Sequence, residues 1–325
     1  MRQNTSLFSD ESLSSLKTAR YSFSGHETFP FRYTWLPKGV QKIQGHSDLF
    51  VRDDAMVILG VGKNMVRSIR HWCEALNLIE ASERGQYCTT PLGYALFDPS
   101  GWDPYLEDPA TLWLLHWLLV SRQNLASTWY LAFTRFNADL FTRDDLVEWI
   151  QKFLNQTSNL NHSSNVHVTP TSLYRDVEVF LRTYIPSQAT RDLPSEDTFD
   201  CPLIELNLIK EVERGTYQFT RGYKSSLPEE IFLYALTNFW QNIAPHQETL
   251  SFETILHGAG SPGMAFKLAE NALVEYIERL PRWSGLTYDD TAGMRLVLRH
   301  KSQNDLEAFS ILRRYYDQTS QETLA

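Results

Sequence analysis

The sequence predicts a mostly α-helical protein with small β-hairpins, a multi-helical chain that contains two or three winged helix-turn-helix units. Three observations support this fold class. Residues 52–97 follow the order helix, tight turn, helix and hairpin. Part of that pattern recurs 130 residues later, and the last third of the chain again follows the order helix, helix and hairpin. Repetition of one supersecondary unit indicates a fold assembled from similar parts.

The first unit is predicted to begin with a short apolar helix over 55–59, which ends at Gly60 and Gly62. Glycine readily adopts the left-handed conformation that commonly closes a helix. A second helix is expected over 63–77, because its apolar residues recur at three- and four-residue steps and form one inward stripe. These residues are Val66, Ile69, Cys73 and Leu76.

The outward face of this second helix carries the functional prediction. It presents one exposed stripe of three cations and two groups that read base edges. The stripe consists of Lys63, Asn64, Arg67, Arg70 and His71. DNA-binding helix-turn-helix units place such a stripe in the major groove. A hairpin with strands at 78–80 and 87–89 follows, and Arg84 at its tip would contact a phosphate or enter the minor groove. The alternative is a solvated basic face in a winged helix that mediates only protein contacts.

The composition limits the kind of nucleic-acid contact. A chain of 325 residues is too long for one small core and fits two or three units. The balance is acidic, with 30 Lys and Arg against 39 Asp and Glu and a net charge of −9. Non-specific affinity for DNA grows with the number of phosphates neutralised. Any contact with double-stranded DNA must therefore come from a local basic face on an acidic body.

The remaining composition indicates a cytoplasmic protein. The three cysteines, Cys73, Cys88 and Cys201, lie in apolar patterns and predict reduced, buried thiols without zinc-site spacing. The first residues lack the apolar core of a signal peptide. The most apolar run, over 111–120, is about half the length that a bilayer requires, so a buried core helix is expected and no membrane contact.

The repeat suggests how the chain divides. Leu76–Ile79 corresponds without gaps to Leu206–Ile209, and Glu83–Gly85 corresponds to Glu213–Gly215. Five parts are predicted: a disordered N-terminal segment over 1–20, an N-terminal segment plus winged helix-turn-helix over 21–100, a helical bundle over 101–157, a second winged-helix-like repeat over 158–225, and a C-terminal helical or winged-helix-like domain over 226–325.

The aromatic segment over 21–40 contains the candidate catalytic residues. Its two prolines, Pro30 and Pro37, suggest an extended segment packed on the first unit. His26 and Glu27 are adjacent, with Arg32 close by, and could form an acid–base or phosphate-gripping cluster. The alternative is that His26 and Glu27 make hydrogen bonds that hold a packed loop in place. From the chemistry alone this alternative is favoured.

Two adjacent acids are the candidate metal ligands. Asp53 and Asp54 precede the short helix over 55–59 and could serve as ligands of Mg²⁺ or Mn²⁺. The favoured alternative is that they are first-turn acids stabilised by the helix dipole. No nuclease motif, Gly-rich phosphate loop or catalytic triad stands out in the sequence.

Four segments together resemble a bacterial family of unknown function whose members accompany DNA phosphorothioation genes. The segments are FSGHETFPFRYTWLPKGV (23–40), VGKNMVRSIRHWCEALNLI (61–79), RDVEVFLRTYIP (175–186) and LTYDDTAGMRL (286–296). The same domain occurs in the DNA-nicking component of the single-stranded (Ssp) phosphorothioation systems, which defend against phage. The resemblance extends over roughly residues 21–318.

The resemblance implies a role beside a cysteine desulfurase, an ATPase and a PAPS-reductase-like enzyme. This chain would contribute a nick in one DNA strand that allows sulfur incorporation. Two alternatives remain: a non-catalytic winged-helix DNA-binding subunit or transcription regulator, and a protein-interaction scaffold for the modification enzymes. Paired winged helices also make a homodimer reasonable.

Overall fold

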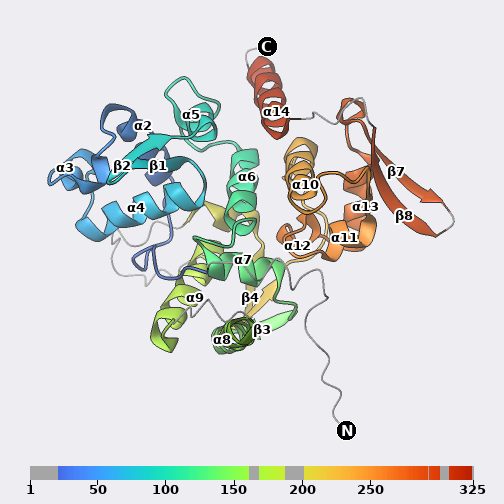
Figure 1. Cartoon of the computed structure of the whole chain (residues 1–325), viewed down its shortest axis with the longest axis horizontal. Coiled ribbons are helices and arrows are strands. Elements are labelled where there is room, and N and C mark those ends of the chain that lie inside the picture. The colour runs from blue at the N-terminus through green and yellow to red at the C-terminus, as the bar shows by residue number, and fades with distance from the viewer. Residues whose placement is uncertain (1–20, 161–167, 187–200, 292, 301–306, 324–325) are drawn as a thin grey trace, which may run out of the picture.

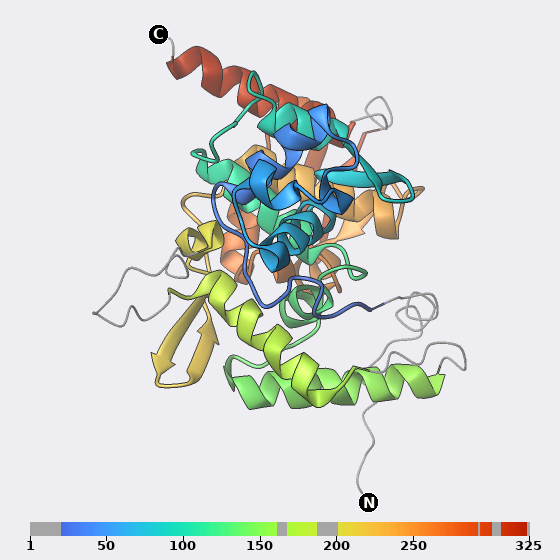
Figure 2. The ribbon, with the colours of Figure 1, turned by 90° about the vertical axis from the view of Figure 1, so that its left-hand side faces the viewer.

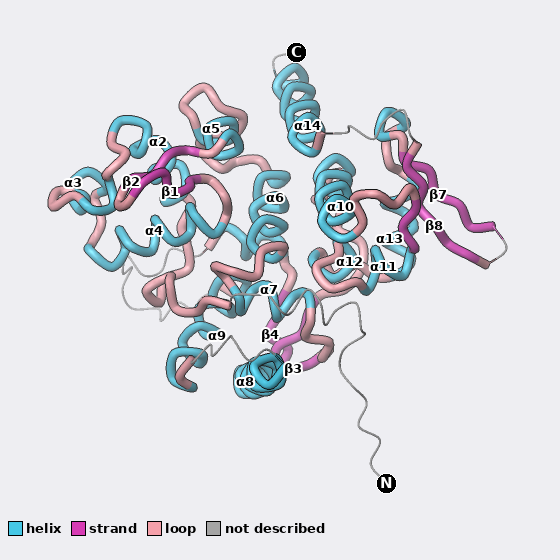
Figure 3. Tube along the Cα trace, in the orientation of Figure 1, coloured by secondary structure: helices cyan, strands magenta, loops and turns pink. Residues whose placement is uncertain are grey.

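The computed structural model describes residues 21–160, 168–186, 201–291, 293–300 and 307–323, so the predicted disordered segment 1–20 lies outside the described residues. The described chain is mostly α-helical, with antiparallel sheets of two, three and three strands (Figure 1). Figure 3 shows that these small sheets lie at separate places around the helices. The predicted fold class is confirmed at the level of many helices with small hairpins.

The first unit follows the predicted order of elements. It contains α2 (Trp35–Gly45), η1 (Leu49–Val51), α3 (Ala55–Leu59), α4 (Lys63–Ala75), β1 (Ile79–Glu83) and β2 (Gln86–Thr89). Gly60 closes α3 with a φ of 65°, as expected for a left-handed helix end. Gly85 has a φ of 79° in the hairpin turn. The short helix, the second helix and the hairpin are therefore confirmed.

The helix α2 corrects the prediction of an extended segment over 21–40. Trp35, Leu36, Val40 and Ile43 recur at helical spacing and are all buried. Pro37 lies in the first turn of α2. A proline there costs little, because the first N–H groups of a helix have no partner within it. Only the residues before Trp35 remain without helix or strand.

The middle of the chain forms a second group of helices and strands. It contains α5 (Pro91–Phe97), α6 (Pro109–Val120), α7 (Ser127–Thr134), β3 (Leu140–Thr142), α8 (Arg143–Leu160), α9 (Pro170–Tyr184), η3 (Pro202–Leu206), β4 (Ile209–Glu213) and β5 (Thr216–Phe219). The strand β3 pairs with β5, and α8 packs beside α9 (Figure 2). The boundary placed at residue 157 therefore runs through α8 and separates strands of one sheet.

The internal repeat extends to the hydrogen-bond register. Ile79 lies opposite Thr89 in the first hairpin, and Ile209 lies opposite Phe219 in the second, an offset of 130 on both strands. The register of both hairpins shifts at the corresponding place, before the turn glycine. Gly215 has a φ of 77°, close to that of Gly85. The sequence match thus reflects two hairpins of one geometry.

The C-terminal part repeats the strand order of the middle part. It contains α10 (Glu229–Ile243), β6 (Thr249–Ser251), α11 (Phe252–His257), α12 (Pro262–Ala265), α13 (Glu270–Glu278), η4 (Arg282–Ser284), β7 (Leu286–Thr291), β8 (Met294–Arg299) and α14 (Ala308–Thr323). The two sheets have the orders β3-β5-β4 and β6-β8-β7, so in each the first strand pairs with the last.

The core joins these parts through α6. Every residue of α6 after Pro109 is buried, as expected of a core helix, and α6 contacts α7, α10 and η3. Among the described residues, no helix has the length and apolar content needed to span a bilayer.

The cysteine prediction needs one correction. Cys73 and Cys201 are buried, but Cys88 is exposed because it lies on the outer side of the two-stranded hairpin.

A close backbone approach between α5 and the residue that precedes β1 yields a stability prediction. A Cβ atom at Gly93 would lie 2.0 Å from the carbonyl oxygen of Leu78. We expect Gly93→Ala to lower the free energy of unfolding by about 3 kcal/mol, because the backbone cannot give way. Urea denaturation measures this. Gly45→Ala is the matched control, since its Cβ would meet no atom within 4 Å. Equal stability of the two variants would contradict the close approach.

Candidate nucleic-acid interface

A strained loop over 22–29 lies between α4, α7 and α9. Ser24, Glu27 and Thr28 have φ values of 68°, 51° and 68°. This left-handed conformation costs a non-glycine residue about 1 kcal/mol or more. Such strain persists only where surrounding contacts determine the backbone. The contacts of this loop therefore decide what its residues can do.

The loop is held by a buried carboxylate on α9. His26 and Asp176 are 2% and 1% exposed. The His26 Nε2 atom lies 2.6 Å from Asp176 Oδ1, and the Ser24 N–H donates to the same oxygen at 2.6 Å. The Thr128 hydroxyl on α7 donates to the other carboxylate oxygen. The Thr28 N–H donates to His26 Nδ1 at 3.2 Å, so the ring proton is on Nε2 and donates to Asp176.

The surroundings of His26 argue against a catalytic role. Its ring stacks on Trp72 at a centroid distance of 5.9 Å and meets the edge of Trp129 at 5.5 Å. Both ring nitrogens already have partners inside the protein. A side chain that is 2% exposed cannot touch DNA. The structure therefore corrects the catalytic prediction for His26 and agrees with the alternative that this residue holds a packed loop.

The other two candidate catalytic residues face different neighbours. The Glu27 carboxylate lies 3.6 Å from the Arg67 guanidinium on α4. The Arg32 guanidinium lies 5.2 Å from the centre of the Trp35 ring at the start of α2. His26, Glu27 and Arg32 thus do not form one acid–base cluster. The loop does, however, lie beside α4, because Trp72 Nε1 donates to the Phe29 carbonyl oxygen at 2.9 Å.

The prediction that His71 reads base edges is wrong. His71 is 7% exposed and lies under the loop. A Cβ atom at Gly25 would be 2.4 Å from His71 Nδ1, so only glycine fits at that position of the loop. Burial lowers the pKa of His71 from 6.5 to about 3, which keeps the imidazole neutral. His71 therefore belongs to the interior and not to the exposed stripe.

The rest of the stripe is on the surface, and we call Lys63, Asn64, Arg67 and Arg70 the α4 ridge. Lys63 and Asn64 are exposed and make no side-chain hydrogen bond or ion pair with any residue that the structure describes. Arg67 is 51% exposed and Arg70 is 40% exposed. Arg84 is exposed at the tip of the β1–β2 hairpin, as predicted. Among the described residues, the ridge thus retains two unpaired side chains and two half-exposed guanidinium groups.

Both ridge arginines have a carboxylate neighbour, but neither is tightly held. The pairs Arg67–Glu27 and Arg70–Glu74 are each 3.6 Å apart, beyond hydrogen-bond distance. Arg70 also lies 3.4 Å from the Tyr87 hydroxyl. Exposed ion pairs of this kind contribute about 0–1 kcal/mol. A phosphate or a base edge can therefore replace the carboxylate at small cost.

A surface hollow of about 390 Å³ lies beside the N-terminal end of α4. Its lining mixes apolar, basic and acidic side chains: Phe50, Val51, Arg52, Asp53, Ala55, Met56, Lys63, Val66 and Arg67. The hollow brings Asp53 beside two members of the α4 ridge. A predicted metal ligand and two of the predicted DNA-binding residues therefore share one surface here.

The residues at this hollow do not fit a protein-held metal ion. Both carboxylate oxygens of Asp54 accept hydrogen bonds from Arg52, at 2.8 and 2.9 Å, and this pairing lowers the pKa of Asp54. Asp53 is then left with Lys63 and Arg67, whose charges repel a cation. Over the residues described, no three His, Cys, Asp or Glu side chains gather to hold a metal. Asp53 and Asp54 therefore do not form the predicted Mg²⁺ or Mn²⁺ site by themselves.

The family of the chain follows from comparison with known proteins. The profile of a family described as a protein of unknown function, DUF4007, matches residues 23–316. The chain belongs to the DUF4007 family. It is also similar to two crystal structures of SspB, one of them bound to a magnesium ion. Each has 31% sequence identity and a TM-score of 0.81 over 93% of this chain and 90% of that chain. No curated protein matches the chain. The family resemblance predicted from the four segments is confirmed.

The buried carboxylate of this DUF4007 protein gives a second stability prediction. We expect Asp176→Ala to lower the free energy of unfolding by about 3–5 kcal/mol, because it leaves His26, Ser24 and Thr128 without their buried acceptor. Glu178→Ala, an exposed acid on the same helix, should change it by less than about 0.5 kcal/mol. Urea denaturation measures the free energy of unfolding of both variants. Similar losses would refute the role assigned to Asp176.

Two buried histidines predict how the stability of the DUF4007 fold depends on pH. Burial lowers the pKa values of His71 and His116 from 6.5 to about 3. At pH values between these two pKa values, the histidines bind protons in the unfolded chain but not in the folded chain. The free energy of unfolding therefore falls as the pH falls. Each histidine contributes about 1.4 kcal/mol per pH unit.

The slope of unfolding free energy against pH between 6 and 4 tests this dependence. In His71→Gln the slope should be shallower by about 1.4 kcal/mol per pH unit. His257→Gln is the control, since His257 is 64% exposed, and its slope should equal that of the wild type. A wild-type slope in His71→Gln would show that His71 is accessible to protons in the folded state.

Proposed function

We propose that this chain binds double-stranded DNA through the α4 ridge and the β1–β2 hairpin, as a component of a bacterial DNA phosphorothioation and phage-defence system. The observation that carries the proposal is the α4 ridge, which stays exposed on a helix backed by a hairpin. The similarity to SspB over 93% of the chain supports the assignment to a phosphorothioation system. Cysteine desulfurase, ATPase and PAPS-reductase-like proteins of such a system are the proposed partners.

In this proposal the first unit acts as a winged helix. The order α3, turn, α4, β1 and β2 is that of a helix-turn-helix with a wing, and α4 takes the place of the recognition helix. Asn64 would read adenine, and Arg67 and Arg70 would contact guanine or phosphate. Arg84 on the wing would contact a phosphate. On a chain with a net charge of −9, binding would be confined to this face.

Strand nicking is a second proposed activity, supported by the resemblance to the DNA-nicking component of Ssp systems. One of the two similar SspB crystal structures is bound to a magnesium ion, so Mg²⁺ or Mn²⁺ is the metal to supply. A magnesium ion commonly takes one or two carboxylates and completes its shell with water and substrate phosphates. Asp53 does not hold such an ion by itself, because Lys63 and Arg67 lie beside it, so phosphates of bound DNA would have to supply further ligands. Glu27 would become available as an acid–base group only after its ion pair with Arg67 is broken.

Loss of the ridge arginines tests DNA binding. We expect Arg67→Ala combined with Arg70→Ala to weaken binding of a 20-base-pair duplex at least tenfold, since two phosphate or base contacts are lost. The slope of log affinity against log salt should also fall by about 2. Gel shifts at two salt concentrations measure both quantities.

The control is Arg279→Ala, which removes an arginine that is 51% exposed and follows the last residue of α13, outside the first unit. Duplex binding that survives the double variant would leave the protein-interaction scaffold as the better function. A supercoiled plasmid incubated with and without Mg²⁺ or Mn²⁺ separates the remaining alternatives. Conversion to open circle indicates a nickase, whereas binding without conversion indicates a non-catalytic DNA-binding subunit or regulator.

A further inference from the structure

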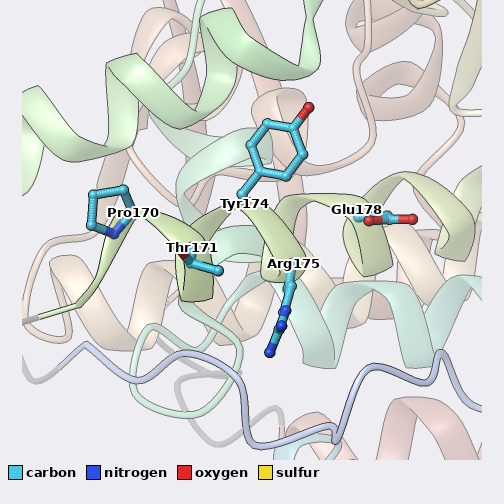
Figure 4. A pocket seen from close by; sticks show the side chains of 5 residues that line it. All are labelled: Pro170, Thr171, Tyr174, Arg175 and Glu178. Atoms are coloured by element: carbon cyan, nitrogen blue, oxygen red, sulfur yellow. The ribbon is translucent and has the colours of Figure 1, made fainter.

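The helix α9 precedes the second hairpin along the chain, as α4 precedes the first, with η3 between α9 and β4. It precedes a hairpin of the same register and packs on a helix that begins after β3. Its exposed side forms a shallow hollow of about 490 Å³, lined by Pro170, Thr171, Tyr174, Arg175 and Glu178 (Figure 4). This hollow has no part in the duplex surface proposed for α4.

An aromatic ring and a guanidinium group are stacked at one side of the hollow. Tyr174 is 38% exposed, although tyrosine rings of the core are almost fully covered. The Arg143 guanidinium lies 4.8 Å from the centre of the Tyr174 ring. This stacking restrains the ring while more than a third of the side chain faces solvent. A restrained, exposed ring is suited to stack on another flat group.

A cation lies at the opposite side of the hollow. Arg175 is exposed and makes no side-chain hydrogen bond or ion pair with any residue in the described part of the chain. Figure 4 shows its side chain pointing away from Tyr174, toward the N-terminal segment. The one acid in the lining, Glu178, lies 3.6 Å from Arg143. The charge of Arg175 is therefore the one left for a ligand.

The strained loop connects this hollow to the α4 ridge. Asp176, next to Arg175, accepts hydrogen bonds from His26 and Ser24 of the loop. Glu27 of the same loop lies 3.6 Å from Arg67 of the ridge. The ridge and Arg175 thus lie on either side of one short loop, whose residues Ser24, Gly25 and Thr28 are exposed. A nucleic-acid chain that leaves the ridge can cross the loop and reach α9.

We propose that the α9 hollow binds an unpaired DNA strand, with a base stacked on Tyr174 and a backbone phosphate on Arg175. The inference rests on the proposed function, because it extends the DNA surface of the first unit. Stacking on an exposed aromatic ring requires an unpaired base, since a duplex buries its base faces. A single free cation with an acid nearby is too weak for a duplex backbone. The hollow is therefore specific for single strands.

Binding of one labelled 20-nucleotide DNA, as a single strand and as a duplex, tests the proposal by fluorescence anisotropy. For Tyr174→Ala combined with Arg175→Ala we expect the single-strand Kd to rise about tenfold, because one stacking contact and one phosphate contact are lost. The duplex Kd should stay within twofold of the wild type. Glu178→Gln removes the repelling acid and should lower the single-strand Kd.

The matched control is Tyr105→Ala combined with Arg279→Ala, an exposed tyrosine and an exposed arginine outside the hollow. It should bind both DNA forms as the wild type does. An unchanged single-strand Kd in the Tyr174 and Arg175 variant overturns the inference, even if duplex binding is intact. An equal loss for single strand and duplex also overturns it, because α9 would then be part of the duplex surface.

The outcomes for this site and for the α4 ridge are distinguishable. One outcome is that Arg67→Ala combined with Arg70→Ala leaves duplex binding unchanged while Tyr174→Ala combined with Arg175→Ala weakens single-strand binding. That result would contradict the proposal for the α4 ridge and support the proposal for the α9 hollow. Circular dichroism melting of each variant confirms that it is folded. Single-strand binding lost only in unfolded variants would count against the hollow.

Discussion

One buried carboxylate positions the parts of this protein that could meet DNA. Asp176 is 1% exposed, and a charge so deeply buried is stable only if hydrogen bonds replace its water shell. Its donors come from the loop over 22–29 and from α7, while Asp176 itself belongs to α9. The same loop is fixed to α4 through Trp72. The Asp176 carboxylate therefore joins the first unit to the second repeat through this loop, beside the core contacts between Trp72 and Trp129.

Local patterns predicted much of the fold. The helix α4, the hairpin that follows and the repeat at an offset of 130 residues depend on spacing and turn residues, which act over a few positions. The burial of His71 could not be predicted in this way. Its spacing of four residues from Arg67 indicates an outward position, but a loop more than 40 residues earlier in the chain covers it. Burial by a distant segment leaves no periodic trace in the sequence.

The candidate catalytic residues show a second limit of sequence reasoning. His26, Glu27 and Arg32 are close in the chain, and this proximity favours one cluster. Left-handed residues turn the backbone sharply, so neighbours along the loop point to different partners. His26 faces α9, and Glu27 faces α4. The packing signal is present in the sequence as a glycine before the histidine, since only glycine fits against His71. The sequence alone does not show that His71 is the residue against which this glycine packs.

In the proposed complex with DNA, the covered side of α4 limits how much of a duplex this helix would contact. The α4 ridge runs from Lys63 to Arg70, a stretch that advances about 10 Å along the helix axis. At about 3.4 Å per step, that length corresponds to roughly three base pairs. A sequence of three base pairs recurs throughout any genome, so one such helix alone would not select a single site. Selectivity would then require several DNA-contacting elements, each of which recognises a short part of a longer sequence.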